Sequence, residues 1–284
     1  MHLASATPVP SAADDFQPFS LVDGDPAAGV LVVCDHADNG LPPEYGDLGL
    51  PAAEFQRHIA YDPGAAAVSR GLARRLGVPA VLSTFSRLLI DPNRGEDDPT
   101  LIMRLSDGAV VPGNAAVDEQ ERARRIARFH APYHAAVEAA IARATATGNP
   151  PIIISMHSFT PVWHGRVRPW HAGVLWDMDP RIAEPLIAAL RSDSDLVVGD
   201  NEPYSGALAN DSMYRHASAR GLAHGLVEIR QDLISEPEGV AAWADRLLRI
   251  VTELNNLPGV HDVGHYGSRA GGLAADDDLK GLVP

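Results

Sequence analysis

The amino-acid sequence predicts an α/β fold: a single domain with a mixed, mostly parallel central sheet that helices cover on both faces. Short segments rich in β-forming residues alternate with longer amphipathic segments along most of the chain, and this alternation is typical of such folds. The chain has 284 residues, of which 45% are hydrophobic, enough to bury one large core. The spacing of the elements favours one domain over two.

Strands are expected where apolar and β-branched residues form runs that are too short for buried helices. The segments 29–34 and 151–156 are the clearest, because almost every residue in them is apolar. Further strands, each a short run between helical segments, are predicted over 79–83, 88–91, 173–176, 195–198 and 223–229.

Helices are expected where apolar residues recur at helical spacing, as Val68, Leu72 and Leu76 do within 64–76. A long helix over 118–144 is acidic at its start, as the helix dipole favours, and Pro132 is expected to kink it. Its preceding loop is long enough to carry function. The other predicted helices occupy 51–57, 180–191, 211–220 and 237–254.

The two ends of the chain differ in composition from the rest. Residues 1–27 are rich in Ala, Pro, Ser and Asp without periodicity, which predicts a flexible leader. Residues 261–284 contain a Gly-Gly pair and three consecutive aspartates and are expected to form a C-terminal tail. The folded α/β domain is therefore predicted to span 28–260.

The charge balance argues against polyanionic partners. The chain has 37 acidic and 23 basic residues, a formal net charge of −14. This charge opposes binding to nucleic acid and to anionic membrane surfaces. We therefore expect neither a nucleic acid nor a membrane as a partner, and composition gives no indication of the oligomeric state.

Cys34 is the only cysteine, and it falls inside a predicted buried strand. An intramolecular disulfide and a cysteine-rich zinc cluster are thereby excluded, so any metal must be bound by His and carboxylate ligands. The sequence shows neither a signal-peptide pattern nor a run of about 18 apolar residues. These features predict a cytoplasmic protein.

His36 and His157 follow the two clearest strands at their carboxyl ends. The carboxyl ends of strands are where open α/β sheets place ligand and metal sites. A single histidine is as often a packing residue as a ligand, but both lie in polar, Pro-containing segments suited to presenting side chains. The pair therefore predicts a metal site, with Zn²⁺ preferred over other divalent metals on ligand type.

A hydrolytic zinc site commonly has three protein ligands and one open position, so one more ligand is needed. Asp62 and Asn39 are the candidates, and Asp62 is chemically the better ligand because it is anionic. Capping of the helix that follows is an equally good interpretation of Asp62.

Glu228 lies inside an apolar strand, with Arg230 two residues further on the same face. A buried glutamate is costly unless it is paired or employed. It either forms an ion pair with a structural arginine or, beside a metal, takes a proton from water and passes it to a leaving amine. We assign the second role, general base and acid, to Glu228.

Arg87, Asn93 and Arg94 are concentrated around another predicted strand end. The planar guanidinium group matches the two oxygens of a carboxylate, and an asparagine can add a donor. This cluster predicts a pocket for an acidic substrate, although an Arg–Asp pair that fixes the loop is the structural alternative. In a polar turn further along, Tyr204 is a candidate to bind substrate as well.

His130 and His134 are four residues apart on the predicted long helix and share one face. The residues between them lack the glutamate of His-Glu-x-x-His proteases. We interpret this pair as mainly structural, with His134 as a candidate to line the pocket.

Several short sequence segments, taken together, resemble the N-formylglutamate amidohydrolase (N-formylglutamate deformylase) family over roughly residues 29–235. No segment is specific alone, but the family has all of them in the same order. They are His36-Ala-Asp-Asn39 with Pro42, Asp62-Pro-Gly-Ala65, Ser86-Arg87, Asp91-Pro-Asn93-Arg94, His157-Ser-Phe-Thr-Pro161, Asn201-Glu-Pro-Tyr-Ser-Gly206 and Val227-Glu228-Ile-Arg230-Gln-Asp-Leu-Ile234.

The resemblance implies a fold similar to the zinc-dependent exopeptidases and a metal held by His36 and His157. It also implies Glu228 as the base and Asn93 with Arg94 as the groups that recognise a substrate carboxylate. The exopeptidase relatives have a carboxylate three residues after the first histidine, where this chain has Asn39. The third ligand therefore stays open between Asp62 and Asn39.

The predicted activity is metal-dependent hydrolysis of a linear amide, with N-formyl-L-glutamate or a related small N-acyl acidic amino acid as substrate. Metal-bound water is the expected nucleophile, and Arg94, Asn93, Arg87, Arg230 and Tyr204 are the expected substrate-binding residues. Two alternatives remain: a metallohydrolase of another N-acyl amino acid or short peptide, and an inactive protein that binds an acidic metabolite. The loop with Trp163 and Trp170 suits either such binding or a substrate lid.

Overall fold

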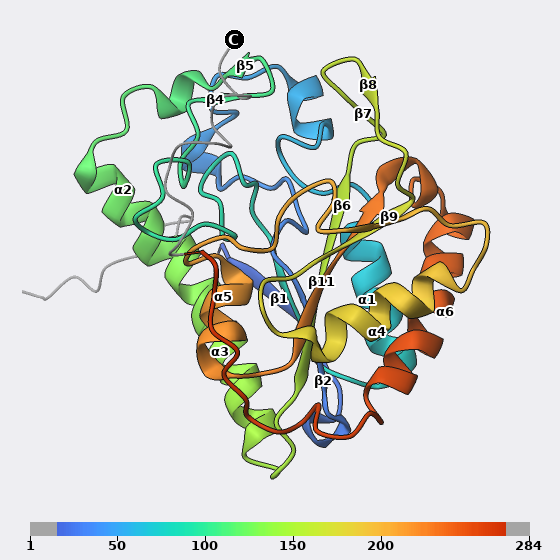
Figure 1. Cartoon of the computed structure of the whole chain (residues 1–284). Helices are drawn as coiled ribbons and strands as arrows, with labels where there is room; N and C mark the ends of the chain where they lie inside the picture. Colours follow the sequence, from blue (N-terminus) through green and yellow to red (C-terminus); the bar gives the residue numbers. More distant parts are fainter. Residues whose placement is uncertain (1–15, 271–284) are drawn as a thin grey trace, which may run out of the picture.

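The computed structural model describes residues 16–270 (Figure 1). Within this range, seven strands form one sheet in the order β1-β3-β2-β6-β11-β9-β10. Their bounds, in chain order, are β1 (Phe19–Val22), β2 (Val30–Cys34), β3 (Ala80–Ser83), β6 (Ile152–Phe159), β9 (Ala172–Leu175), β10 (Val198–Asp200) and β11 (His224–Arg230).

The four central strands β3, β2, β6 and β11 are mutually parallel. At one edge β1 pairs antiparallel with β3, and at the other β9 pairs antiparallel with β11 and parallel with β10. The predicted mixed, mostly parallel sheet is thus confirmed. Because the central strands are parallel, their carboxyl ends meet at one edge of the sheet, where side chains from distant segments converge.

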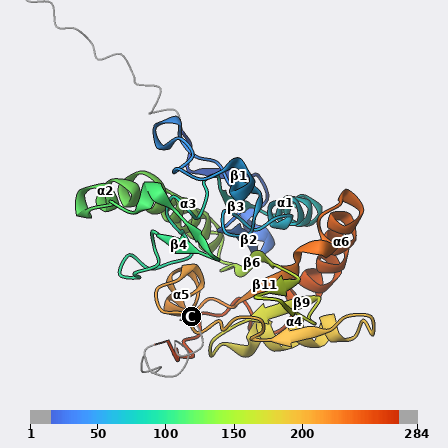
Figure 2. The same cartoon turned by 90° about the horizontal axis from the view of Figure 1, so that it is seen from above.

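Helices cover both faces of this sheet, as predicted. In Figure 2 the sheet runs between one group formed by α1, α4 and α6 and another formed by α2, α3 and α5. Their bounds are α1 (Ala65–Leu76), α2 (Glu119–Arg125), α3 (Ala131–Thr145), α4 (Pro180–Arg191), α5 (Ser212–His216) and α6 (Pro237–Leu254).

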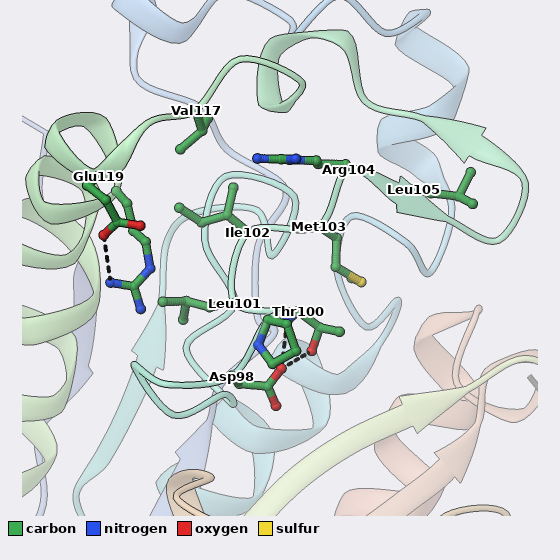
Figure 3. A pocket seen from close by; sticks show the side chains of 11 residues that line it. Asp98, Thr100, Leu101, Ile102, Met103, Arg104, Leu105, Val117 and Glu119 are labelled. Atoms are coloured by element: carbon green, nitrogen blue, oxygen red, sulfur yellow. Dashed lines mark hydrogen bonds and ion pairs between the residues drawn. The ribbon is translucent and has the colours of Figure 1, made fainter. Parts of the chain in front are cut away.

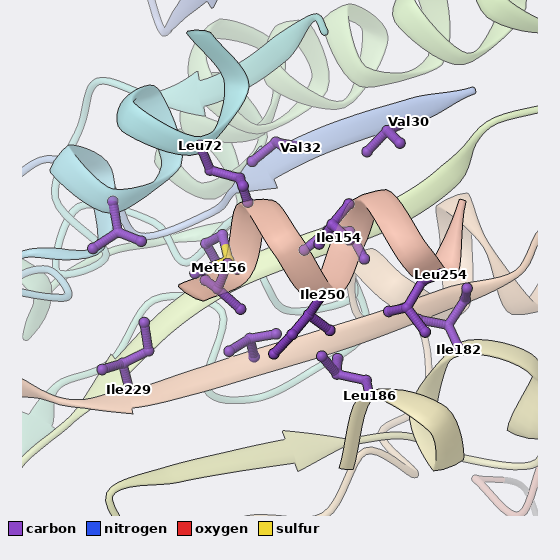
Figure 4. Close-up of a cluster of buried hydrophobic side chains, with 14 of the residues drawn as sticks. Val30, Val32, Leu72, Ile154, Met156, Ile182, Leu186, Ile229, Ile250 and Leu254 are labelled. Carbon is purple, nitrogen blue, oxygen red and sulfur yellow. The ribbon is translucent and has the colours of Figure 1, made fainter. Parts of the chain in front are cut away.

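Two hydrophobic clusters, one on each face, hold the layers together. Figure 4 shows one of them, in which Leu72 of α1, Ile182 of α4 and Ile250 of α6 point at the strands. Ile154 and Met156 of β6 meet them from the sheet, and all of these side chains are buried. Burial of an aliphatic side chain of this size contributes about 1.5–3 kcal/mol relative to exposure. The sheet is therefore a firm base for the loops at its carboxyl edge.

Two small hairpins lie at the upper end of Figure 1. The loop before α2 carries the hairpin of β4 (Leu105–Ser106) and β5 (Ala109–Val110). The segment beyond the carboxyl end of β6 carries the hairpin of β7 (Val162–Trp163) and β8 (Arg166–Val167).

The predicted strand over 88–91 is wrong, because this segment forms a buried turn. Its main-chain carbonyls are satisfied by side chains instead of by a neighbouring strand. Asn114 Nδ2 donates to the Leu88 carbonyl at 2.7 Å, and Arg125 Nη1 donates to the Leu89 carbonyl at 2.8 Å. An apolar run of this length cannot by itself distinguish a strand from a buried turn.

The long predicted helix is interrupted by a π-helical turn over Ile126–His130, which separates α2 from α3. Pro132 has no N–H for the bond to the carbonyl four residues earlier, and its ring crowds that carbonyl, so the helix widens before it. The segment predicted as a helix over 51–57 forms a 3₁₀ helix, Ala52–Gln56.

The predicted ends of the domain also need correction. Phe19–Val22, placed in the leader, forms the edge strand β1, a four-residue element too short to show a clear period. In the predicted tail, the Gly264 amide donates to the Gly221 carbonyl and Arg269 forms an ion pair with Asp177. Within the two predicted end segments, residues 1–15 and 271–284 lie outside the described part of the chain.

Within residues 16–270, none of the helices combines the length and the hydrophobicity needed to span a bilayer.

Candidate active site

A cavity of about 480 Å³ opens at the carboxyl edge of the central strands, a size usual for small-molecule sites. It brings together segments that are far apart in the sequence. The polar and ionisable residues that line it include His36, Asp62, Arg87, Asp91, Asn93, Arg94, His157, Tyr204, Asp211 and Glu228.

His36, Asp62 and His157 form a buried group at the floor of this cavity. Asp62 Oδ2 lies 2.9 Å from His157 Nδ1 and 3.5 Å from His36 Nδ1. One ligand atom from each residue lies within 4.8 Å of the other two. Two imidazole nitrogens and a carboxylate oxygen at this spacing can hold a metal ion.

The second nitrogen of each ring contacts another carboxylate. His36 Nε2 lies 2.6 Å from Asp91 Oδ1, and His157 Nε2 lies 3.3 Å from Asp35 Oδ2. Metal-binding histidines usually donate their other N–H to a carboxylate or a carbonyl, which fixes the ring. The arrangement thus leaves both Nδ1 atoms facing Asp62.

The electrostatics of this group favour positive charge. Burial alone lowers the pKa of His157, but its hydrogen bonds with Asp35 and Asp62 outweigh burial and raise the pKa to about 10. Burial raises the pKa of Asp62, yet Arg87 and His36 hold it well below its ordinary value. The buried carboxylates therefore stabilise a cation among them.

Arg87 occupies part of this space. Its Nη2 lies 2.5 Å from His36 Nδ1, and its Nη1 donates to Asp62 Oδ1 at 3.4 Å. The same Nη2 lies 2.9 Å from His36 Nε2. The donor set fits a metal, and Arg87 lies directly beside it.

Glu228 is the register partner of His157 on the neighbouring parallel strand. Burial raises the pKa of its carboxyl to about 7, with Asp62 adding to the rise and His157 opposing it. Its Oε2 is buried without a hydrogen-bond partner, whereas Asp91 Oδ2 and Arg87 Nε form an ion pair at 3.6 Å. Since buried polar atoms are normally paired, Glu228 Oε2 indicates a site built for a ligand.

Asn93 and Arg94 line the cavity on the side of α5. Asn93 Oδ1 accepts from the Ser212 amide at 3.1 Å, and Arg94 donates to the Asn93 carbonyl and to Thr100 Oγ1. These bonds fix the loop and orient both side chains. Tyr204 also lines the cavity and is 41% exposed.

Two sequence candidates lie outside the cavity lining. Asn39 Nδ2 donates to the Phe55 carbonyl at 2.6 Å. Arg230 pairs with Asp232 and donates to the carbonyls of Arg168 and Trp170. Of the two candidates for the third ligand, Asp62 is the one that lies beside both histidines.

Sequence reasoning missed several carboxylates of the site. Asp35 accepts from Tyr133 Oη and Ser212 Oγ at 2.7 Å each while it contacts His157. Asp211 caps α5 by accepting from the Tyr214 amide, and burial raises the pKa of its carboxyl to about 7. The position of Asp35 directly before His36 was the available signal. Nothing in the sequence distinguished Asp211 from a simple helix cap.

His130 and His134, predicted to be mainly structural, form a buried chain with His216. His134 Nδ1 lies 2.7 Å from His216 Nε2, and His134 Nε2 lies 3.2 Å from His130 Nε2. His130 Nε2 also contacts the Arg94 carbonyl at 2.9 Å. Neither His130 nor His134 lines the cavity. The chain lies behind the Arg94 loop and supports it.

A second cavity, of about 350 Å³, adjoins the first and shares Met103 with it (Figure 3). Several of its polar groups bond to one another, since Asp98 accepts from Thr100 and Glu119 pairs with Arg122. It contains no histidine. The chemistry-bearing residues thus gather in the first cavity.

Comparison with known proteins identifies the family of this chain. Residues 28–235 match the family model for N-formylglutamate amidohydrolase. Among solved structures, gene product Atu2144 from Agrobacterium tumefaciens is 36% identical, with a TM-score of 0.79 over 85% of this chain and 96% of that one. N-formylglutamate amidohydrolase from Ralstonia eutropha JMP134 is 22% identical, with a TM-score of 0.58 over 84% and 97%, and so supports the fold. No curated protein matched. With the matched segment reaching from the strand before His36 to the end of β11, the chain belongs to the N-formylglutamate amidohydrolase family and is a hydrolase that acts on amides.

Proposed function

We propose that this protein hydrolyses the amide bond of N-formyl-L-glutamate or of a closely related N-acyl acidic amino acid, with water as the nucleophile. The observation that carries the proposal is the placement of Glu228. Its unpaired Oε2 is buried in the cavity that also holds the His36–Asp62–His157 group and Arg94.

His36, Asp62 and His157 are the residues that would hold a zinc ion, through the two Nδ1 atoms and a carboxylate oxygen. When bound, the zinc would polarise the scissile carbonyl and lower the pKa of water at the site. Asp91 and Asp35 would fix the two imidazole rings through their Nε2 atoms.

Glu228 acts as the base and then as the acid. Its carboxylate takes a proton from the attacking water as the new C–O bond forms, and it passes that proton to the amine nitrogen as the C–N bond breaks. A carboxyl with a pKa of about 7 suits both steps, because it accepts and returns a proton with little energetic cost near neutral pH. Formate and glutamate are the products of the formyl substrate.

Arg94 and Asn93 orient the substrate by binding a carboxylate. Arg94 Nη1 and Nε are held by the Asn93 carbonyl and Thr100, so the guanidinium is fixed at the edge of the cavity. A fixed guanidinium loses little entropy on binding. Arg87, which lies beside His36 and Asp62, would stabilise the negative charge that develops on the scissile carbonyl.

The proposal is tested by measuring glutamate release from N-formyl-L-glutamate by purified protein, with zinc in one sample and a chelator in another. We expect turnover that zinc restores to the chelated enzyme. A zinc-replete protein without turnover on this substrate, but with turnover on neutral N-acyl amino acids, would refute the substrate assignment. Turnover that persists unchanged with the chelator would refute the metal.

A further inference from the structure

Arg168 is a buried cation behind the wall of the active-site cavity. It follows the β7–β8 hairpin and is only 7% exposed. No Asp or Glu side chain among residues 16–270 forms an ion pair with it. A buried charge without a counter-ion is costly and is rarely kept without a use.

The guanidinium of Arg168 is surrounded by aromatic rings and hydroxyl groups. It lies 5.0 Å from the ring centre of Tyr204 and 5.2 Å from that of Trp163, with Phe159 also within cation–π distance. Its Nη1 donates to Tyr204 Oη at 3.0 Å and to Thr160 Oγ1 at 3.3 Å. Tyr204 and Trp163 both line the cavity, so Arg168 lies directly behind its wall.

The main chain around Arg168 is fixed from both sides. The Arg168 amide donates to the Pro161 carbonyl at 2.9 Å. Arg230 donates to the carbonyls of Arg168 and Trp170 while Asp232 holds its guanidinium. Arg230, expected from the sequence to contact substrate, therefore supports the segment that carries Arg168.

The bond from Arg168 sets the role of the Tyr204 hydroxyl group. A phenol can donate one hydrogen bond and accept others. Because its oxygen already accepts from Arg168, its O–H is left to donate, and the neighbouring positive charge strengthens that donation. The hydroxyl therefore favours an anionic acceptor in the cavity.

We propose that Arg168 and Tyr204 form a second carboxylate-binding subsite, which takes the side-chain carboxylate of an N-acyl dicarboxylic amino acid. Arg94 and Asn93 hold the other carboxylate. Tyr204 makes the contact with the substrate, and Arg168 is a positioning residue that supplies the charge. This inference rests on the proposed amide hydrolysis and makes the pocket selective for substrates with two carboxylates.

The test compares N-formyl-L-glutamate with N-formyl-L-glutamine, which has the same shape but a neutral side chain. The variants are Arg168→Met, which keeps the bulk and removes the charge, and Tyr204→Phe, which removes only the hydroxyl. For the glutamate substrate we expect Arg168→Met to raise KM by about 10–100-fold, the range for hydrogen bonds to charged groups, with a much smaller change in kcat. For the glutamine substrate, kcat/KM should stay within about threefold of the parent enzyme.

Arg166→Met is the matched control, because Arg166 lies two residues away on the same hairpin and is exposed. It should leave the preference between the two substrates unchanged. Tyr204→Phe should shift the preference in the same direction as Arg168→Met and by at least as much, because it removes the hydroxyl group that contacts the substrate. Should Arg168→Met fold poorly, Tyr204→Phe decides the question alone, because the exposed ring stays in place. An equal loss on both substrates in either variant would overturn the subsite.

A binding experiment separates this inference from the proposed function. Calorimetric titration with L-glutamate and L-glutamine measures the subsite without turnover. A parent enzyme that binds glutamate more tightly, a preference lost in Arg168→Met, supports the subsite even if no amide is hydrolysed. If the enzyme hydrolyses N-formyl-L-glutamate but shows no preference for glutamate that depends on Arg168, the proposed function stands and the subsite is refuted.

Discussion

Glu228 and His157 are register partners on the adjacent parallel strands β11 and β6, so their side chains leave the sheet on the same face and at the same level. The proposed acid–base group and one candidate metal ligand are thus positioned by main-chain pairing in the centre of the sheet. A site built on strands is held more tightly than one built on loops. This relationship makes Glu228 the residue whose replacement is most informative.

Glu228→Gln should preserve the fold and lose at least about 10²–10⁴-fold in kcat, because the amide cannot accept a proton from water. KM should change little. Steady-state turnover of N-formyl-L-glutamate gives both constants, and Glu238→Gln, at an exposed position in α6, is the control. Near-normal turnover in Glu228→Gln would remove this residue from the base role.

Asp62→Asn should abolish stabilisation by zinc, whereas Asn39→Ala should retain it. Asp62 lies beside Nδ1 of both histidines, while the Asn39 amide is bonded to the Phe55 carbonyl. A ligand at 100 times its Kd stabilises a folded protein by about 2.7 kcal/mol, which a thermal melt with and without zinc detects. The opposite pattern, with Asn39→Ala insensitive to zinc, would make Asn39 the third ligand.

Asp91→Asn should weaken zinc binding by about 10–100-fold without removing a ligand, because the carboxylate on Nε2 of His36 orients the ring and raises its basicity. Competition between the protein and a chromogenic chelator measures the affinity. Asp245→Asn, at an exposed position in α6, supplies the comparison. Equal affinity in Asp91→Asn and the parent protein would show that this contact does not support metal binding.

Much of this site could be predicted because it follows from strand pattern. Two apolar runs located His36 and His157 at the carboxyl edge of the sheet, and strand alternation placed Glu228 inside the third strand of the site. Each of these inferences needs only the two-residue period of a strand and the parallel order of the sheet.

The rest depended on contacts that sequence spacing does not encode. Strand alternation assigned Arg230 to the face of Glu228, but its long side chain turns to carbonyls of the segment after β8. Conversely, Arg168 follows a two-residue strand that has no sequence signature, and only the structure shows it behind Tyr204. The end point of a flexible side chain is decided by tertiary partners that become adjacent only in the fold.

Arg94→Ala should raise KM for N-formyl-L-glutamate by about 10–100-fold, the range for a lost charge-assisted hydrogen bond. Because Arg94 is fixed by Thr100 and the Asn93 carbonyl at the cavity edge, kcat should fall much less. Arg94→Lys should recover only part of the affinity, since lysine lacks the planar fork. Arg104→Ala, exposed in the same loop, is the control, and an unchanged KM in Arg94→Ala would exclude a carboxylate contact.

His216, which is buried in the chain of three histidines, should make the stability of the protein depend on pH under acidic conditions. Burial lowers the pKa of its imidazole from 6.5 to about 3, and burial likewise lowers the pKa values of His130 and His134. Below pH 6.5 the unfolded chain takes up a proton at this position while the folded protein does not. The contribution of His216 to stability is therefore complete above pH 6.5 and is lost progressively as the pH falls toward 3, by up to about 1.4 kcal/mol per pH unit.

His216→Gln removes this titration while keeping an acceptor for His134 Nδ1. Urea unfolding at pH 7, 6, 5 and 4 should show a shallower loss of stability with falling pH in His216→Gln than in the parent protein. His265→Gln, at an exposed position, should follow the parent curve. Parallel curves for His216→Gln and the parent would mean that the imidazole takes up its proton at the same pH in the folded and the unfolded protein, and the chain of neutral histidines behind Arg94 would have to be revised. A shallower curve instead identifies the chain as neutral packing that stays uncharged near pH 7, the pH at which Glu228 is proposed to exchange its proton.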